Sequence, residues 1–272
     1  MATFLFWNIA RKPLAEVVAR LAVRHQADIV LLAESELSPA QILVALNRPA
    51  KIWQFAAPLI SGREKIHIFT RLGKGNLAER LDAPRWTIRE LARPALPAVT
   101  IVAVHLPSKL RSNPSSQAFE CAELAADIRA IEAQVGHERT LVVGDFNMNP
   151  FEEGMLAANG LHGESSRRLA MARERVVEGK KYPFFYNPMW NFWGDAGRGP
   201  GGTYFHRSSD RVRLSWNLFD QVLVRPDLLP FFDNAELQIL ETDGVKSFLT
   251  RAGTPTTRDG SDHLPILFSL QM

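Results

Sequence analysis

The sequence predicts a mixed α/β or α+β fold in which helices cover β-sheets. Strands and helices alternate early in the chain, and pairs of strands follow later. Of the 272 residues, 46% are hydrophobic, which is enough for one sizeable core. The sequence contains no internal repeat, low-complexity segment or interdomain linker. We therefore expect residues 1–272 to form a single domain.

The first half of the chain alternates short apolar runs with segments of helical spacing. Short apolar runs predict strands, and apolar residues repeating every three or four positions predict helices. Pro13 is typical of a first helical turn, Ser38 of a helix cap and Gly136 of a helix end. Residues 61 and 62 are expected to form a turn between two strands. We expect strands at 3–9, 28–33, 52–58, 65–70, 86–91 and 98–105, and helices at 13–27, 38–46 and 115–135.

The second half opens with the apolar run 141–143, which predicts a buried strand. Residues 151–214 are the least regular part of the chain. There we expect helical pieces at 152–158 and 167–175, an aromatic run at 182–195 and a loop at 197–202. Further strands are expected at 219–224, 237–240 and 264–270, with a loop at 250–261.

The charge and cysteine content place weak limits on the partners. The 32 Lys and Arg against 29 Asp and Glu give a net charge of +3, which permits a polyanionic substrate without requiring one. Cys121 is the single cysteine, so the chain has no disulfide framework of its own, and we expect it to be buried. No run approaches the ~20 apolar residues of a membrane span, and the N-terminus does not resemble a signal peptide. We expect a cytoplasmic monomer that does not insert into membranes.

Several predicted strands carry a polar residue at or near one end. A carboxylate or amide at the end of a buried strand is costly to place unless it binds something. The clearest case is the segment 141–150, where Asp145 and Asn147 directly follow a buried strand. The full set is Asn8, Glu34, His105, Asp145, Asn147, Asp220, Asp262 and His263.

Each of these residues also has a purely structural interpretation. Asn8 could cap the following helix, Glu34 could form an ion pair at a sheet edge, and His105 could be a hydrogen-bonded core histidine. Asp220 could pair with an arginine, and the segments 145–147 and 262–265 could be polar turns. Together, however, the residues form a coherent set. Carboxylates suit Mg²⁺ or Mn²⁺, and histidines and amides suit phosphate oxygens. The sequence shows neither a Cys/His cluster for zinc nor the glycine-rich GxxxxGK loop of nucleotide-binding proteins.

Six short segments along the chain carry the polar strand ends. They are FWN at 6–8, DIVLLAE at 28–34, VHLPS at 104–108, GDFNMNP at 144–150, FDQVLV at 219–224 and SDHLPI at 261–266. In these segments the chain resembles the endonuclease/exonuclease/phosphatase superfamily, which has the DNase I-like fold. They occur in family order and span nearly the whole chain, and GDFN with SDHxP is the most specific pair. The resemblance implies a four-layer αββα sandwich with two mixed central sheets and an active site where the strand ends meet.

The resemblance also implies roles in metal binding and water activation. Glu34 would be the principal ligand of Mg²⁺ or Mn²⁺, supported by Asn8 and Asp262. Asp145 would orient and deprotonate the attacking water, and Asn147 would position Asp145 and a phosphate oxygen.

The remaining roles concern the phosphate. His263, held by Asp220, would be a charged donor that stabilises the transition state, and His105 would bind phosphate or assist the leaving oxygen. The reaction would be in-line attack of water on phosphorus without a covalent enzyme intermediate. Two departures stand out: many relatives have Gln where this chain has Ala33, and Glu36 is an additional carboxylate near the expected site.

The substrate is less well defined by the sequence. Lys109 and Arg111 lie where a phosphate-facing loop would be, although they could equally belong to a solvated loop. The same segment, LPSKLRSN, lacks the Tyr that abasic-site endonucleases of the superfamily usually carry. Trp216 and Asn217, shortly before Asp220, are expected to line the pocket.

Aromatic and arginine residues alternate between 182 and 216. Bases can stack on aromatic rings while Arg binds phosphate, although most of these rings could be core residues. The residues are Tyr186, Trp190, Trp193, Tyr204 and Trp216, with Arg198, Arg207, Arg211 and Arg213.

The sequence therefore predicts a divalent-metal-dependent phosphodiesterase, a nuclease acting on DNA or RNA. The alternative is a phosphatase acting on small phosphomonoesters or inositol phosphates, because the fold of these relatives does not decide the substrate. A catalytically silent binding module is a third interpretation. It is disfavoured because no carboxylate or histidine of the expected set is missing.

Overall fold

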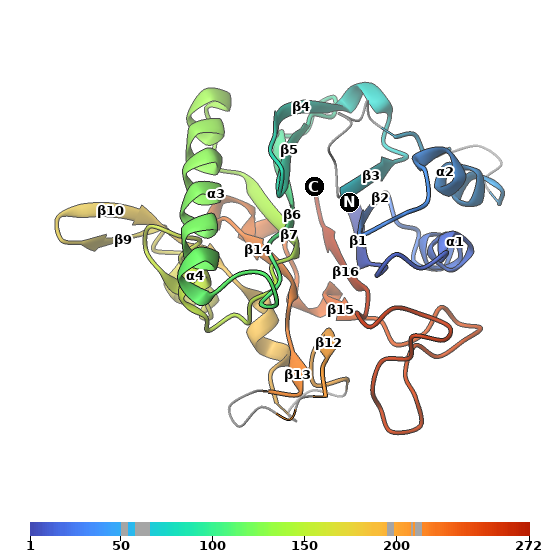
Figure 1. The fold of residues 1–272 in the computed structure, drawn as a ribbon. Helices are drawn as coiled ribbons and strands as arrows, with labels where there is room; N and C mark the ends of the chain where they lie inside the picture. The colour runs from blue at the N-terminus through green and yellow to red at the C-terminus, as the bar shows by residue number, and fades with distance from the viewer. Residues whose placement is uncertain (50–53, 58–65, 195–198, 208, 210–213) are drawn as a thin grey trace.

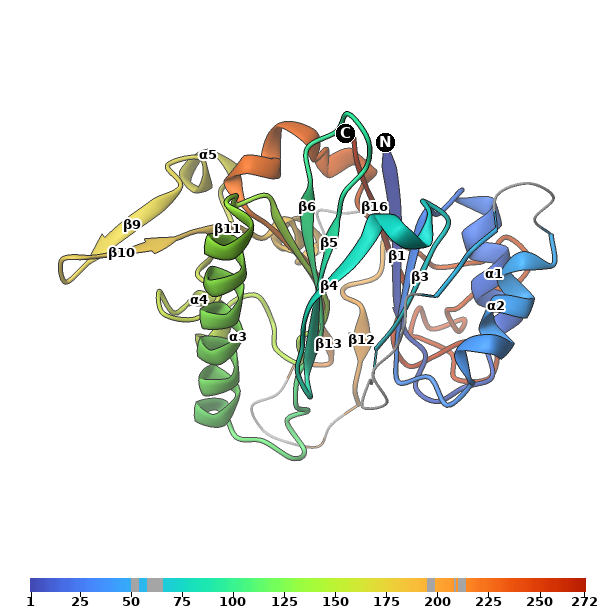
Figure 2. The ribbon, with the colours of Figure 1, turned by 90° about the horizontal axis from the view of Figure 1, so that it is seen from above.

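Two β-sheets face each other at the centre of the protein, and helices cover their outer faces (Figures 1 and 2). The computed structural model describes residues 1–49, 54–57, 66–194, 199–207, 209 and 214–272. In Figure 2 the layers run from α1 and α2 through one sheet, then the second sheet, to α3. This arrangement confirms the predicted mixed fold of two sheets flanked by helices.

The first sheet contains the two ends of the chain side by side. Its order among the described residues is β15-β16-β1-β2-β3, with β1 parallel to β2 and antiparallel to β16. Helices α1 and α2 lie on its outer face (Figure 1). The bounds are β1 Ala2–Asn8, α1 Ala15–Arg24, β2 Ile29–Ala33, α2 Pro39–Asn47, β3 Ile66–Thr70, β15 Gln238–Ile239 and β16 Ile266–Leu270.

The second sheet has the order β4-β5-β6-β7-β14-β11-β8. Strands β6 and β7 are parallel, and β14 is antiparallel to β7. Helix α3 covers the outer face, with α4 beside it (Figures 1 and 2). The bounds are β4 Leu77–Asp82, β5 Trp86–Leu91, β6 Val99–His105, α3 Pro114–Val135, β7 Thr140–Asp145, α4 Glu153–Leu156, β8 Gly163–Glu164, β11 Phe185–Tyr186 and β14 Asp220–Val224.

The remaining elements are small. A two-stranded hairpin, β9 with β10, projects from the body of the protein (Figure 1), and β12 pairs with β13. Short 3₁₀ helices span Lys74–Asn76, Pro188–Phe192, Pro226–Phe231 and Asn234–Glu236. The other bounds are α5 Arg167–Ala170, β9 Glu174–Val177, β10 Lys180–Pro183, β12 Tyr204–Phe205 and β13 Trp216–Asn217.

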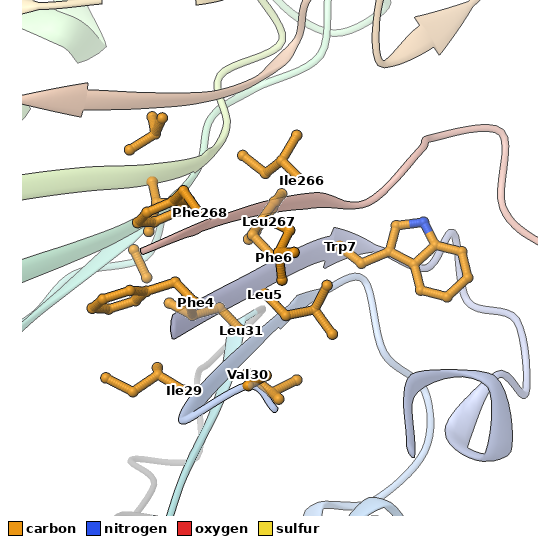
Figure 3. Close-up of a cluster of buried hydrophobic side chains, with 14 of the residues drawn as sticks. Phe4, Leu5, Phe6, Trp7, Ile29, Val30, Leu31, Ile266, Leu267 and Phe268 are labelled. Atoms are coloured by element: carbon orange, nitrogen blue, oxygen red, sulfur yellow. The ribbon is translucent and has the colours of Figure 1, made fainter. Parts of the chain in front are cut away.

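The core has two parts. One lies between the sheets and under α1 and α2, and Figure 3 shows its aromatic part, in which the Phe4 and Phe268 rings stack 4.9 Å apart. The other lies between the second sheet and α3 and includes Cys121, Ile128 and Val142. Cys121 is fully buried, as expected, and burial is the main cause that raises its thiol pKa to about 12. The central strands are buried on both faces, which explains their continuous apolar sequences.

The structure confirms most predicted elements and two of the three helix signals, those of Ser38 and Gly136, whereas Pro13 lies before the first turn of α1. Ser38 caps α2 through a hydrogen bond from the Gln41 amide at 3.3 Å, and Gly136 ends α3 with φ +74°. The first helix begins at Ala15, two residues after Pro13. Of the predicted strand 52–58, the structure describes residues 54–57, where Ala56 bridges Thr70; the predicted turn at 61–62 lies outside the described residues.

One predicted helix is much shorter than expected, and one strand of the second sheet was missed. The basic helix predicted at 167–175 ends at Ala170, because the chain turns at Arg173 with φ +73° and enters the hairpin of β9 and β10. Strand β4 was not predicted, since most of its side chains are exposed or half-buried and its sequence, LAERLD, lacks an apolar run.

No helix in the described part of the chain is both long enough and apolar enough to cross a bilayer.

Candidate active site

The ends of five strands meet at one edge of the sandwich. In the first sheet Asn8 ends β1, and Glu34 directly follows β2, the strand parallel to it. In the second sheet His105 and Asp145 are register partners at the ends of the parallel strands β6 and β7. Asp220 begins the antiparallel strand β14 opposite Asp145. The sheet topology therefore brings together residues that are far apart in the sequence.

Asp145 is held by residues from both sheets. Asn8 Nδ2 donates a hydrogen bond to Asp145 Oδ2 at 2.9 Å, and the Asn147 amide donates to Asp145 Oδ1 at 2.8 Å. Asn147 has a left-handed backbone with φ +53°, and its side-chain amide donates to the Leu106 carbonyl at 2.9 Å. Its backbone amide thus contacts Asp145, while its Nδ2 is engaged within the protein.

The carboxyl group of Asp145 is a candidate general base. Asp145 is 1% exposed, and burial is the main cause that raises its pKa to about 6. The carboxylate of Asp220 also raises the pKa, whereas the nearby His263 and His105 lower it. A carboxyl group with this pKa is mainly ionised at neutral pH and is more basic than an ordinary aspartate. It is therefore suited to accept a proton from water.

His263 forms a short hydrogen bond with Asp220. The atoms Nδ1 of His263 and Oδ2 of Asp220 are 2.7 Å apart, while His263 Nε2 lies 4.0 Å from Asp145 Oδ2. Burial opposes the charged imidazole, but the carboxylates of Asp220 and Asp145 raise its pKa to about 10. His263 is therefore a cation at neutral pH.

Asp145, Asp220 and His263 form a compact cluster, in which one ligand atom from each lies within 4.8 Å of the others. In the described part of the chain, this is the one group of three or more His, Cys, Asp and Glu residues that fits such a sphere. A protonated imidazole has no free lone pair for a metal. With His263 charged, the cluster is an ion network.

Glu34 fits a divalent cation better. Its carboxylate accepts a hydrogen bond from His105, with Nε2 and Oε1 3.3 Å apart, and this contact is the largest cause that lowers its pKa to about 2. Asn8 lowers the pKa further by a side-chain hydrogen bond. The Glu34 side chain is 31% exposed, so an ionised oxygen ligand faces the surface. This is the donor chemistry that Mg²⁺ and Mn²⁺ prefer.

The other two predicted metal ligands have partners within the protein. Asn8 Oδ1 accepts the Ala10 amide at 3.0 Å, which leaves one lone pair of this oxygen. Asp262 is half-buried, and its Oδ1 accepts the Ser261 hydroxyl at 3.2 Å. Both offer an oxygen, the ligand atom that Mg²⁺ and Mn²⁺ prefer, and their role as ligands stays a prediction.

The four predicted substrate-binding residues are not equivalent. Lys109 forms an ion pair with Glu152, and its ammonium lies 5.4 Å from the centre of the Phe219 ring. Arg111 is exposed. Both residues lie in the loop after β6. A carboxylate neutralises the Lys109 side chain, whereas Arg111 has no carboxylate partner among the described residues.

Trp216 and Asn217, which were predicted to line the pocket, both have contacts within the protein. The half-buried Trp216 ring packs edge-on against Phe205, with centroids 5.2 Å apart. Asn217 is 5% exposed, and its Oδ1 accepts a hydrogen bond from Asn149 at 3.0 Å. Their role in substrate binding stays a prediction.

A groove of about 350 Å³ opens beside Glu34 and His105. Three arginines line it: Arg11, Arg85 and Arg111. Glu36 also lines the groove; its side chain is 72% exposed and lies 4.0 Å from Arg11. The extra carboxylate noted in the sequence is therefore at the groove surface.

Sequence reasoning gave no site role to Trp7 and Asn149, and it named Tyr204 only as part of the aromatic and arginine pattern. Trp7 Nε1 donates to the His263 carbonyl at 2.9 Å, and the Tyr204 ring lies 4.6 Å from the His263 ring. Asn149 Oδ1 accepts the Leu218 amide at 2.9 Å and ties the loop after β7 to the start of β14. Trp7 and Asn149 lie within the FWN and GDFNMNP segments, which were the available signals.

The aromatic and arginine pattern at 182–216 is only partly described. Tyr186 is 2% exposed and belongs to the core, while Trp190 and Trp193 pack against Phe151. Arg207 is exposed. Arg198, Arg211 and Arg213 lie outside the described residues.

Solved structures with a similar fold act on or contain DNA. The 3′ phosphatase NExo from Neisseria, bound to a product DNA hairpin, is 17% identical, with full coverage (100%) of both chains and a TM-score of 0.58. An AP endonuclease from Archaeoglobus fulgidus is 13% identical, with 100% coverage of both chains and a TM-score of 0.58. TDP2 from D. rerio, complexed with a single-strand DNA product, is 15% identical over 98% of this chain and 97% of that chain, with a TM-score of 0.55.

At these identities the likeness shows the fold alone. No curated protein matches the chain. The model of the endonuclease/exonuclease/phosphatase family matches residues 5–263, which include every strand end at the site. The chain therefore belongs to the endonuclease/exonuclease/phosphatase family.

Proposed function

We propose that the protein is a divalent-metal-dependent phosphodiesterase that cleaves nucleic acid by in-line attack of water on phosphorus. The observation that carries this proposal is the pairing of a buried carboxylate with a buried imidazolium. Asp145 Oδ2 and His263 Nε2 are 4.0 Å apart. Asn8 holds the carboxylate by a hydrogen bond, and Asp220 holds the imidazole by another. Family membership supports a hydrolase that acts on phosphoesters.

Asp145 is suited to orient and deprotonate the attacking water. Hydrogen bonds from Asn8 and Asn147 fix the two oxygens of its carboxylate, so the group cannot rotate away. Burial makes the carboxylate more basic. A fixed base with a pKa near the working pH is the arrangement that general-base catalysis requires.

His263 is suited to stabilise the charge that develops on the phosphoryl oxygens. Its Nδ1 is held by Asp220 at 2.7 Å, which leaves Nε2 as the donor that faces Asp145. A charged donor fixed in place before the reaction stabilises the transition state without reorganisation. His105, whose Nε2 contacts Glu34, would bind the same phosphate or assist the leaving oxygen.

Glu34, with Asn8 and Asp262, would hold Mg²⁺ or Mn²⁺. When bound, the ion supplies Lewis-acid polarisation of a phosphoryl oxygen. Within the protein, Glu34 also orients His105 through the 3.3 Å contact, so the metal site and the phosphate site share one carboxylate.

Two features favour nucleic acid over a small phosphomonoester. The groove beside Glu34 carries three arginines, and the Tyr204 ring next to His263 offers an aromatic surface. Arginine and aromatic surfaces together are typical of sites for single-stranded nucleic acid. The fold similarity to proteins solved with DNA is consistent with this substrate class.

A substrate panel tests the proposal. It contains single-stranded and duplex DNA, abasic duplex, RNA, inositol phosphates and bis(p-nitrophenyl) phosphate, each with Mg²⁺, with Mn²⁺ and with EDTA. We expect cleavage of nucleic acid that EDTA abolishes and that Asp145→Asn and His263→Ala each reduce by about 10²–10⁴-fold. Asp259→Asn is the control, because Asp259 is a half-buried residue that pairs with Lys246. Full activity in both active-site variants, or activity confined to phosphomonoesters, would overturn the proposal.

A further inference from the structure

We propose that Arg85 and Arg111 form a phosphate-binding subsite for the nucleotide next to the scissile phosphate. This inference rests on the proposed function and deepens it, because it requires a substrate strand that continues past the cleavage point. Both arginines line the groove of about 350 Å³ that also contains Glu34 and His105. The groove is therefore continuous with the catalytic residues.

The backbone places both arginines next to the strand that carries His105. Arg85 lies in the turn between β4 and β5, and its carbonyl accepts the His105 amide at 2.8 Å. Arg111 follows β6 by six residues, and its amide donates to the Ser108 carbonyl at 2.9 Å in a tight turn. These hydrogen bonds hold the backbone of both arginines beside the site.

The two guanidinium groups have no acidic partner in the described part of the chain. Arg85 is half-buried and Arg111 is exposed, and neither has a carboxylate within 4.0 Å among the residues that the structure describes. Arg11, the third arginine of the groove, differs: its Nε lies 3.6 Å from Glu34 and 4.0 Å from Glu36. The groove thus holds two cations whose charge is not neutralised by the protein.

A phosphate group would neutralise the guanidinium groups of Arg85 and Arg111 in the groove. The planar guanidinium presents paired donors that fit two phosphate oxygens. Each such contact with a nucleic-acid backbone also releases condensed counterions, which favours binding. A scissile phosphate between Asp145 and His263 leaves the strand free to continue past His105 into the groove. The next phosphate of the strand then reaches Arg85 and Arg111.

The residues that lead to His263 have different chemistry. Among them Lys109 is neutralised by Glu152 and lies over Phe219. The Phe219 ring stacks on Tyr204, with centroids 5.2 Å apart, and Tyr204 lies against His263. The groove beside Glu34 and His105 therefore holds cations without a carboxylate partner among the described residues, whereas the surroundings of His263 are aromatic. This difference favours the groove as the phosphate subsite.

Steady-state kinetics on two substrates test the subsite. One is a fluorescent single-stranded oligonucleotide, and the other is bis(p-nitrophenyl) phosphate, which has a single phosphate and cannot occupy the groove while it reacts. We expect Arg85→Ala and Arg111→Ala each to lower the ratio of kcat/KM for the oligonucleotide to that for the diester about tenfold, mainly through a higher KM. For each variant, the slope of log KM against log salt concentration should fall in magnitude by about 0.7.

Arg168→Ala is the charge-matched control, because Arg168 is an exposed arginine of α5 that does not line the groove. Its ratio and salt slope should equal those of the wild type. Two outcomes would refute the subsite, provided that the wild type cleaves the oligonucleotide. In the first, the two groove variants keep the wild-type ratio of kcat/KM values and the wild-type salt slope. In the second, they lose activity equally on both substrates. A wild type that cleaves neither substrate refutes the proposed function itself.

Discussion

Asp145 and Asp220 face each other as register partners on β7 and β14, and His263 contacts both at unequal distances. His263 is hydrogen-bonded to Asp220 at 2.7 Å, whereas 4.0 Å separates it from Asp145. The close carboxylate fixes the ring and its charge. The distant one leaves room for a reacting group, so two chemically identical side chains acquire different roles from geometry alone.

Replacing Asp220 with Asn should lower the pKa of His263 and reduce activity. The Asp220 carboxylate is a main cause of the raised pKa of about 10, and its loss leaves burial to favour the neutral ring. We expect the imidazole to titrate several pH units lower and kcat to fall about 10²–10⁴-fold. NMR titration of the His263 ring gives the pKa, and Asp227→Asn on the surface is the control. A His263 pKa still near 10 would contradict this interpretation.

Replacing Glu34 with Gln should weaken binding of Mn²⁺. A neutral amide loses the charge that attracts the cation, and we expect the Kd from calorimetry to rise at least about tenfold. Glu36→Gln is the matched control, because Glu36 lines the same groove but is 72% exposed and lies beside Arg11. An equal loss in the two variants would place the ion outside the site centred on Glu34.

Trp7→Phe should reduce both activity and stability. The substitution removes the hydrogen bond to the His263 carbonyl. It retains an aromatic ring to pack on Phe248, whose ring centroid lies 5.1 Å from that of Trp7 in the wild type. We expect unfolding in urea to show a loss of about 1–2 kcal/mol and kcat to fall about tenfold. Trp86→Phe loses a comparable bond to Asp127, outside the site, and should lose stability alone. Equal kcat values for the two variants would show that Trp7 does not position His263.

The Asp243 carboxylate should contribute stability that acid removes. Burial opposes ionisation, but hydrogen bonds from the Lys246 and Val245 amides and from Arg20 lower its pKa. Because the folded pKa lies below the unfolded value of about 4, this contribution is complete above pH 4 and is lost as the pH falls through the folded pKa. Asp243→Asn should therefore lower the free energy of unfolding at pH 7 and much less at pH 2.5, measured by urea titration. A difference independent of pH would contradict this linkage.

Gly144→Ala should destabilise the protein strongly. A Cβ at Gly144, where φ is +155°, would lie 2.0 Å from the Val104 carbonyl oxygen across β6 and β7. Overpacking against the backbone should cost about 3 kcal/mol or more in urea unfolding. Gly179 is the control: it has φ +78° and open space around its Cβ position, so Gly179→Ala should cost only about 1–2 kcal/mol. Similar losses in the two variants would argue against the close approach of the strands.

The sequence was sufficient for the fold where strands are buried on both faces. β2, β6 and β7 are continuous apolar runs, and the structure confirms each of them. It was insufficient where strands are solvated. β4 and the hairpin of β9 and β10 expose charged side chains, so neither shows the alternation or the apolar run that marks a strand.

The polar strand ends were visible in the sequence, but their contacts were not. The register of β6, β7 and β14 puts His105, Asp145 and Asp220 together, as the family resemblance implied. The pairing of Lys109 with Glu152, 43 residues away, and the inward turn of Asn217 depend on tertiary packing that no local pattern encodes. For the same reason Arg85, in a turn between two strands, carried no signal.

The pairing of β1 with β16 joins residues from opposite ends of the chain, for example Ala2 with Leu270. A nascent chain emerging from the ribosome can present Asn8, Asp145 and Asp220 while His263 is still inside the exit tunnel. His263 and β16, the strand that pairs with β1, are synthesised after these residues. We expect every chain that stops before β16 to be inert, so the proposed hydrolysis would begin only after β16 has left the tunnel and docked on β1.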